Sequence, residues 1–320
     1  MPQLESVNTA GRERTTAGSV GIAAGLFAHL FWGASVLFWP LLDDLPAVSI
    51  LAHRMMWTCA FMLLVLLSTK RWGEVKTAFA RSKTIRLLLF CAFLLAGNWG
   101  LFLWAVNSGR VIETSLGYYI TPLLNVLMGR LLLGERMTRA QGMGILLAVA
   151  GVAWGLIVYG HFSWLSLVLA STFAIYGYMQ KTISVEAAPS LFIETLFLTP
   201  MCIIWLLVMH PGNFGTLIGH GPGRTMLLLS TVFFTAVPLL TFSFAARHVT
   251  LTTIGVLQFV SPSINFLLAV FAMGEQVKPS DFVTFPLIWL ALAIYTWDAI
   301  RRMQSLRHKV NIMDTDKGRK

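Results

Sequence analysis

The chain has 320 residues, of which 56% are hydrophobic and only 12% charged, and its formal net charge is +10. Soluble globular domains carry about 25% charged residues, so this composition excludes a water-soluble globular protein and predicts an all-α membrane protein. The positive charge does not indicate nucleic-acid binding, because the Lys and Arg residues lie in short connections and tails between apolar stretches.

Ten apolar stretches have the length of about 20 residues that a helix needs to cross the hydrocarbon core of a membrane. In chain order, the ten predicted transmembrane helices span residues 20–39, 47–67, 85–107, 114–133, 139–158, 162–181, 189–209, 225–245, 251–273 and 281–300. Residues 1–19 and 301–320 form polar tails, and the N-terminal tail is expected to be disordered.

The positive charges predict on which side of the membrane each connection lies. If the N-terminus is inside, 20 of the 24 Lys and Arg residues fall on the inner side. This bias predicts a multi-pass inner-membrane protein with both tails in the cytoplasm. Residues 70–86 carry six of these charges together with Trp72. We expect a solvated charged loop there, and the alternative is a segment lying along the membrane surface.

A motif of the fourth predicted helix recurs in the ninth, 140 residues later. The two copies are Thr121-Pro122-x-x-Asn125 with Gly134-Glu135, and Ser261-Pro262-x-x-Asn265 with Gly274-Glu275. The sequence therefore predicts a duplicated five-helix unit, with copies at 20–158 and 159–300. Because five is odd, the two copies must have opposite orientations, and inverted repeats of this kind are typical of secondary transporters.

Each repeated helix carries polar side chains beside its proline. At spacing i, i+4 and i+7, which is one helix face, these residues are Tyr118, Pro122 and Asn125 in the first copy and Gln258, Pro262 and Asn265 in the second. A proline leaves the carbonyl four residues earlier without its helical donor. Either both helices line a central substrate cavity, or the prolines only shape packing and the asparagines bond to neighbouring helices.

Other polar and aromatic residues lie within the predicted membrane segments. Around the cavity we expect Trp32, Asn98 and Tyr176. A charge near the middle of the bilayer costs about 2.5–3.5 kcal/mol and needs a partner or a role. Three titratable residues are therefore candidates for proton coupling, with structural pairing or packing as the alternative: His29, Glu113 and Glu194. For Arg54, pairing and function are equally open.

Gly151-x-x-x-Gly155 forms a small-residue face that permits close helix packing. We expect this face to pack within the chain, and a homodimer contact is the alternative. The sequence has none of the common catalytic or nucleotide-binding motifs, and its three cysteines have no paired spacing. Neither an enzyme, a metal site nor a cofactor is therefore expected.

Seven segments between about residues 20 and 302 carry more specific motifs. They are Leu51-Ala52-His53-Arg54, Asn98-Trp99, Phe102–Asn107, Glu113–Leu123, Gly134-Glu135-Arg136, Ile193-Glu194-Thr195 and Trp297–Ile300. Together they resemble the RarD family of EamA-type drug/metabolite transporters. The resemblance implies a ten-helix permease with a cavity surrounded by the first, third, fourth, sixth, eighth and ninth helices. Thr121 and Ser261 depart from the Asn and Gly common in the family.

The sequence thus predicts a secondary transporter that moves a small organic metabolite or drug across the inner membrane by alternating access. Its expected partners are the small-molecule substrate and membrane lipids. The alternative function is a non-transporting integral-membrane scaffold or sensor that binds partners through its tails.

Overall fold

The computed structural model of the chain describes residues 2–42, 44–108, 110–160, 163–210, 221–272, 279 and 281–317, and the described part is built from helices. In chain order the α-helices are α1 (Pro2–Ala34), α2 (Ala47–Ser68), α3 (Trp72–Phe79), α4 (Ser82–Asn107), α5 (Val111–Leu132), α6 (Arg139–Tyr159), α7 (Trp164–Thr182), α8 (Ala187–Met209), α9 (Pro222–His248), α10 (Leu251–Gln258), α11 (Val260–Phe271) and α12 (Asp281–Lys317). Two short 3-10 turns, Ser35–Leu37 and Trp39–Leu42, follow α1.

Eight helical segments of the described chain are long and apolar enough to cross a membrane. They lie in α1, α2, α4, α6, α8, α9, the α10–α11 pair and α12. The other two predicted spans are the helices α5 and α7, which carry more polar groups, among them Glu113 and Arg130 in α5 and Lys181 in α7. The chain is therefore a multi-pass membrane protein whose described residues form helices and their connections.

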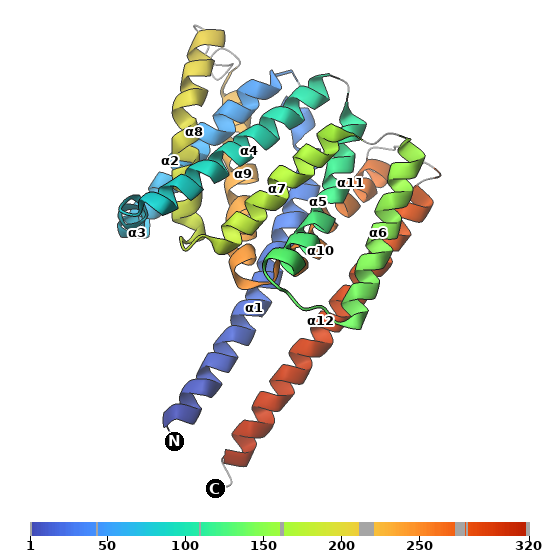
Figure 1. Ribbon diagram of the computed structural model, residues 1–320. Coiled ribbons are helices and arrows are strands. Elements are labelled where there is room, and N and C mark those ends of the chain that lie inside the picture. Colours follow the sequence, from blue (N-terminus) through green and yellow to red (C-terminus); the bar gives the residue numbers. More distant parts are fainter. Residues whose placement is uncertain are drawn as a thin grey trace.

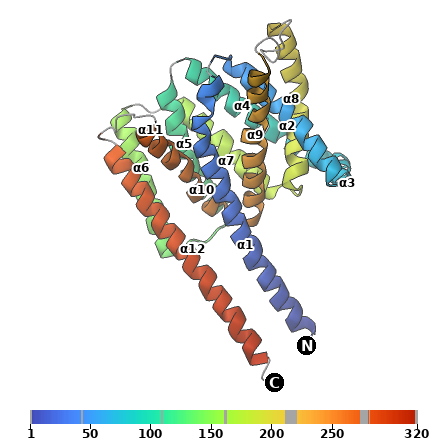
Figure 2. The ribbon, with the colours of Figure 1, turned by 180° about the vertical axis from the view of Figure 1, so that it is seen from behind.

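The predicted tails differ from the structure. Residues 2–19 continue α1, and α12 extends to Lys317, so the expectation of a disordered N-terminal tail is wrong. A helix that is already formed extends without the cost of a new first turn, and the Glu, Arg and Ala residues of this segment favour helix. Both helices project from the same end of the bundle, so the two termini lie on one side, as an even number of crossings requires (Figures 1 and 2).

The segment expected to be a charged loop contains the short helix α3. Val75 and Ala78 are buried on one face of α3, and the Trp72 ring packs against Phe192 of α8. Apolar residues three positions apart place this face on one side of a helix and leave the charges on the other. The loop expectation is therefore wrong, because the spacing of the apolar residues outweighs the density of charge.

The helices pack in a bundle with α6 and α12 paired at one edge and α2, α3 and α8 at the opposite edge (Figures 1 and 2). Between them α1 packs on α9 and α11, and α5 packs on α7 and α10. The Gly151 face meets α12, where a Cβ at Gly151 would lie 3.1 Å from the Thr284 carbonyl oxygen. The small-residue face thus packs within the chain, as expected, rather than being free for a second copy.

The ninth predicted span is divided at Phe259 into α10 and α11. The break lies at the residue after Gln258, whose carbonyl loses its helical donor because Pro262 has no N–H. The Phe259 N–H turns instead to the Val256 carbonyl, 3.2 Å away. In the fourth predicted span, which carries the matching motif, Pro122 lies inside the uninterrupted helix α5. The two repeated helices therefore have different shapes in one structure.

Candidate functional site

The polar residues of the two repeated helices meet at one point of the bundle. Asn125 of α5 donates from Nδ2 to Oε1 of Gln258 of α10, at 2.6 Å, and both side chains are buried. Gly255 allows this approach, since a Cβ there would lie 2.6 Å from the Pro122 carbonyl oxygen. The contact joins the two predicted repeats through a buried amide pair.

The remaining pair of predicted residues has a different environment. Tyr118 is 54% exposed, and Asn265 is also exposed. Pro122 is buried and Pro262 half-buried. The structure therefore brings Asn125 and Gln258 together and leaves Tyr118 and Asn265 accessible.

An aromatic cluster lies beside this point. The Trp32 ring contacts Phe242 at 5.8 Å and Phe173 at 6.1 Å between centroids, and the buried Tyr176 ring stacks on Phe242. The His29 ring packs 5.4 Å from Trp32. These contacts join α1, α7 and α9 around two of the predicted cavity residues.

His29 is buried and bonded to α11. Its Nδ1 lies 3.3 Å from the Ser261 hydroxyl, which donates to the His29 carbonyl at 2.8 Å. Its Nε2 is buried without a hydrogen-bond partner among the described residues. The ring nitrogen left over is compatible with a proton site, but the other contacts are those of a packing residue.

Asn98 and Glu113 link neighbouring helices instead. Asn98 Nδ2 donates at 2.8 Å to the carbonyl of Leu169 and to the Thr172 hydroxyl, both in α7. Glu113 accepts a hydrogen bond from the Ser163 hydroxyl and lies 3.8 Å from Arg110. Glu113 thus has the structural partners that the sequence left as the alternative to proton coupling, and Asn98, which was expected beside the cavity, links α4 to α7.

Glu194 of α8 has the most polar surroundings of the candidate residues. Its buried carboxylate accepts hydrogen bonds from Gln180 Nε2 at 2.6 Å, the Ser190 hydroxyl at 2.8 Å and the Tyr176 hydroxyl at 3.2 Å. Arg247 of α9 donates to Gln180 Oε1 at 2.8 Å. The positive charge of Arg247 is therefore connected to the Glu194 carboxylate through the side chain of Gln180. A buried charge needs such partners, and a network of this kind can also hold and release a proton.

Known proteins resemble this chain in both sequence and fold. The EamA-like transporter family model matches residues 19–157. A protein RarD of Streptomyces exfoliatus is 39% identical over 91% of this chain and 92% of its own. The chain belongs to the RarD family of EamA-type transporters. An uncharacterized transporter of Pseudomonas aeruginosa is 38% identical over 89% of this chain and 96% of its own. A crystal structure covering 88% of this chain and 98% of its own matches with TM-score 0.68 at 18% identity, which shows the shared fold.

Membership of the RarD family makes the chain a membrane transporter.

Two polar residues with partners on other helices, Glu135 and Arg54, were not among the residues predicted from the sequence to line the site. Glu135 accepts hydrogen bonds from the backbone N–H groups of Leu251 and Thr252 at 2.7 and 2.9 Å, and from the Thr252 hydroxyl at 2.7 Å. It therefore closes the start of α10 onto the end of α5. Its recurrence in the repeat was the available signal, and the matching Gly274-Glu275 lies outside the described residues.

Arg54 is the second of these residues. Its Nε donates to the Thr235 hydroxyl at 2.9 Å, and its guanidinium lies 4.7 Å from the Trp39 ring and 4.9 Å from the Trp99 ring. It is also close enough to Tyr118 to interact with it electrostatically. A cation held between aromatic rings beside an exposed tyrosine is a suitable contact for a polar group of a substrate.

Proposed function

We propose that this RarD-family protein is a secondary transporter that moves a small organic metabolite or drug across the inner membrane by alternating access. In this proposal ten crossings form two inverted repeats, residues 20–158 and 159–300, with both tails in the cytoplasm. The repeats then exchange conformations around a shared site near the middle of the membrane, as inverted repeats do in other transporters.

One observation carries the proposal. The repeat aligns Asn125 with Asn265 and Tyr118 with Gln258, so the bond between Asn125 and Gln258 has the counterpart Asn265 and Tyr118. The first pair is bonded and buried, whereas both members of the second are exposed. Two equivalent contacts, one closed and one open, are what an alternating-access protein contains when one side is shut.

The closed contact lies toward the inner side in the proposed orientation. The ninth crossing begins on the inner side at Leu251, so Gln258 lies nearer the inner side of the membrane than Asn265. Glu135 reinforces the same closure from the end of α5. We therefore assign the structure to a state open to the outside, with Tyr118, Asn265 and Arg54 available to substrate and Trp32 at the base of the site.

For proton coupling we favour Glu194 over Glu113 and His29. Glu194 has three hydrogen-bond donors inside the bundle and an arginine linked through Gln180. Glu113 is paired with Arg110 and Ser163 at the start of α5. His29 has Ser261 as its polar side-chain partner.

Thiol labelling in intact cells tests the open and closed pairs. The native cysteines are replaced by Ser, and Asn265→Cys and Asn125→Cys are each exposed to a membrane-impermeant maleimide. Asn265→Cys should react from the outside and Asn125→Cys should be protected. Labelling of Asn125→Cys but not of Asn265→Cys would contradict the assigned state.

Transport itself is tested with purified protein in liposomes. A thermal-shift screen first identifies a metabolite that raises the melting temperature, because a ligand that binds only the folded state stabilises it. The double variant Asn125→Leu with Asn265→Leu should insert normally but move none of this compound. Equal transport by the double variant rejects the site, and a wild-type protein that moves no solute under any gradient favours the scaffold alternative.

A further inference from the structure

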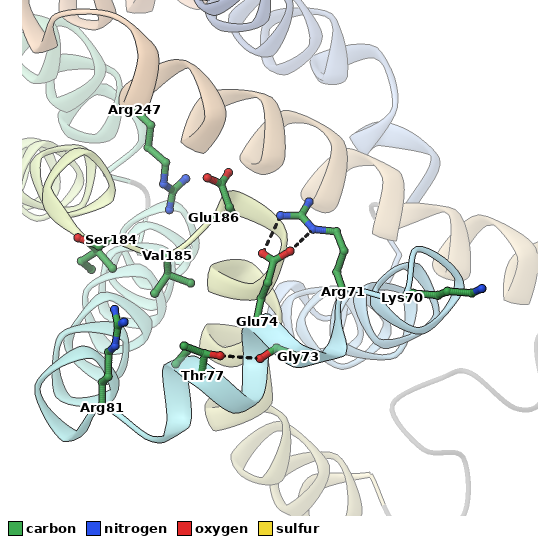
Figure 3. Close-up of a pocket in the computed structure, with 12 residues that line it drawn as sticks. Lys70, Arg71, Gly73, Glu74, Thr77, Arg81, Ser184, Val185, Glu186 and Arg247 are labelled. Carbon is green, nitrogen blue, oxygen red and sulfur yellow. Dashed lines mark hydrogen bonds and ion pairs between the residues drawn. The ribbon is translucent and has the colours of Figure 1, made fainter.

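A cavity of about 500 Å³ opens where three connections of the chain meet, apart from the amide pairs described above. It is lined by residues of α3 and its flanks, by the α7–α8 connection and by Arg247 near the end of α9 (Figure 3). The charge bias places all three connections on the inner side. The cavity therefore lies at the level where lipid headgroups border the protein.

The lining is basic. It contains Lys70, Arg71, Arg81 and Arg247 but only the two carboxylates Glu74 and Glu186. Glu74 is already occupied, because Arg71 donates to both of its oxygens at 2.6 and 2.8 Å. These hydrogen bonds hold the pKa of the Glu74 carboxyl below its ordinary value, so it stays paired with Arg71 near neutral pH. Apart from this pair, the lining has three positively charged side chains, Lys70, Arg81 and Arg247, and one carboxylate, Glu186.

Two of these cations point into the cavity from opposite sides. In Figure 3 the guanidinium groups of Arg81 and Arg247 approach the Ser184–Val185 segment from below and above. Arg247 gives one nitrogen to the Ser243 carbonyl and another to Gln180, and its Nε is buried without an acceptor among the described residues. An anion between the two arginines would add a negative charge beside Arg247, whose charged neighbours are Glu186 and Glu194.

The surroundings favour a lipid as the source of the anion. Helix α3 buries Val75 and Ala78 but leaves Phe79 46% exposed, and Trp72 lies on its apolar side. Apolar and aromatic residues next to a cluster of Lys and Arg are typical of a segment at the membrane surface. Basic pockets at this level bind the headgroups of anionic lipids.

We propose that this cavity binds the phosphate of an anionic phospholipid headgroup between Arg81 and Arg247. The chemistry is recognition of a phosphate by two guanidinium groups, which donate charge-assisted hydrogen bonds. Arg247 also donates to Gln180, which in turn donates to Glu194. The bound lipid would therefore contact an arginine that is one side chain away from the buried carboxylate.

Native mass spectrometry of the full-length protein in detergent tests the site, with phosphatidylglycerol as the probe and phosphatidylcholine as the neutral comparison. Loss of a charge-assisted hydrogen bond weakens binding by roughly tenfold or more, so the Kd for phosphatidylglycerol should rise at least tenfold in Arg81→Gln. Arg81→Lys should retain most of the binding. Lys76→Gln removes the same charge from an exposed position of α3 outside the cavity and should change the Kd less than about twofold.

Three results would overturn the proposal. Equal losses in Arg81→Gln and Lys76→Gln would show diffuse attraction to a basic surface. Equal binding of the two lipids would show that no anion is recognised. Displacement of phosphatidylglycerol by an equal concentration of glycerol 3-phosphate would assign the cavity to a soluble phosphate compound instead. The melting temperature of each variant serves as the control for folding. We expect it to be unchanged, because Arg81 and Lys76 are both exposed.

Discussion

Substitution of Glu135 would measure how firmly α10 is held against α5, the contact that we propose closes the inner side. The Glu135 carboxylate accepts two backbone hydrogen bonds at the start of α10 and one from the Thr252 hydroxyl. In Glu135→Gln the size is kept, but the charge and one acceptor oxygen are lost. Hydrogen bonds to charged groups contribute about 1.5–3 kcal/mol each, against about 0.5–1.5 for neutral ones. Interaction with the helix dipole adds about 0.3–1 kcal/mol.

Taken together, these differences predict that local opening of α10 becomes easier by about 2–3 kcal/mol, because the losses are not fully additive. Each 1.4 kcal/mol corresponds to a factor of about ten. Hydrogen exchange of the Leu251 and Thr252 amides should therefore accelerate by roughly 30- to 150-fold, since exchange reports the opening free energy of a segment.

Hydrogen exchange with mass spectrometry measures this rate in wild type and Glu135→Gln. The matched control is Glu113→Gln, in which the replaced glutamate lies near the start of α5 and binds Ser163 rather than α10. The control should leave exchange at Leu251 and Thr252 unchanged. If exchange there is the same in Glu135→Gln as in wild type, Glu135 does not hold α10 on α5, and the assigned closure loses its main support.

Two further substitutions probe contacts within the bundle. Gly255→Ala places a Cβ 2.6 Å from a backbone oxygen of α5, and the overpacking should lower the free energy of unfolding by about 1–3 kcal/mol. In the control variant Gly100→Ala the new Cβ meets no atom within 4 Å, so this variant should not be destabilised. Equal effects of the two substitutions in denaturant titrations would contradict the close approach at Gly255. Tyr176→Phe removes one of the three hydrogen-bond donors to Glu194. It should lower the free energy of unfolding by about 1–3 kcal/mol and therefore lower the melting temperature. Tyr178→Phe, in the same helix, is the control and should leave the melting temperature unchanged.

The positions of the helices were largely predictable because the signals are local. Apolar stretches of bilayer length predicted the spans. The two prolines were treated alike, and the sequence did not distinguish Pro262, beside which the ninth span is divided at Phe259, from Pro122, which lies inside the uninterrupted α5. Gly151 and Gly155 predicted close packing, which α12 provides. Helix α3 was missed because the six charges of residues 70–86 masked a short apolar face.

The candidate site was only partly predictable, since its contacts join residues far apart in the chain. Sequence spacing placed Asn125 and Gln258 on the right faces but could not show that they bond to each other. The partners of Glu135 and Arg54 come from other helices, α10 and α9 among them. Nor can a symmetric motif show that Asn265 is exposed while Asn125 is buried, because that difference depends on the conformation and not on the residue type.

The division of the ninth predicted crossing at Phe259 leaves two separate half-helices, α10 and α11. Helix α10 stays docked on α5, while α11 packs along α1, so the two halves follow different neighbours. A change of backbone angles at a single residue is then enough to tilt one half without unfolding either. Since α5 continues without a break through Pro122, the proposed exchange of conformations would join the two halves of the ninth crossing and divide the fourth. On that proposal, the transport cycle would pass one helix break back and forth between the repeats.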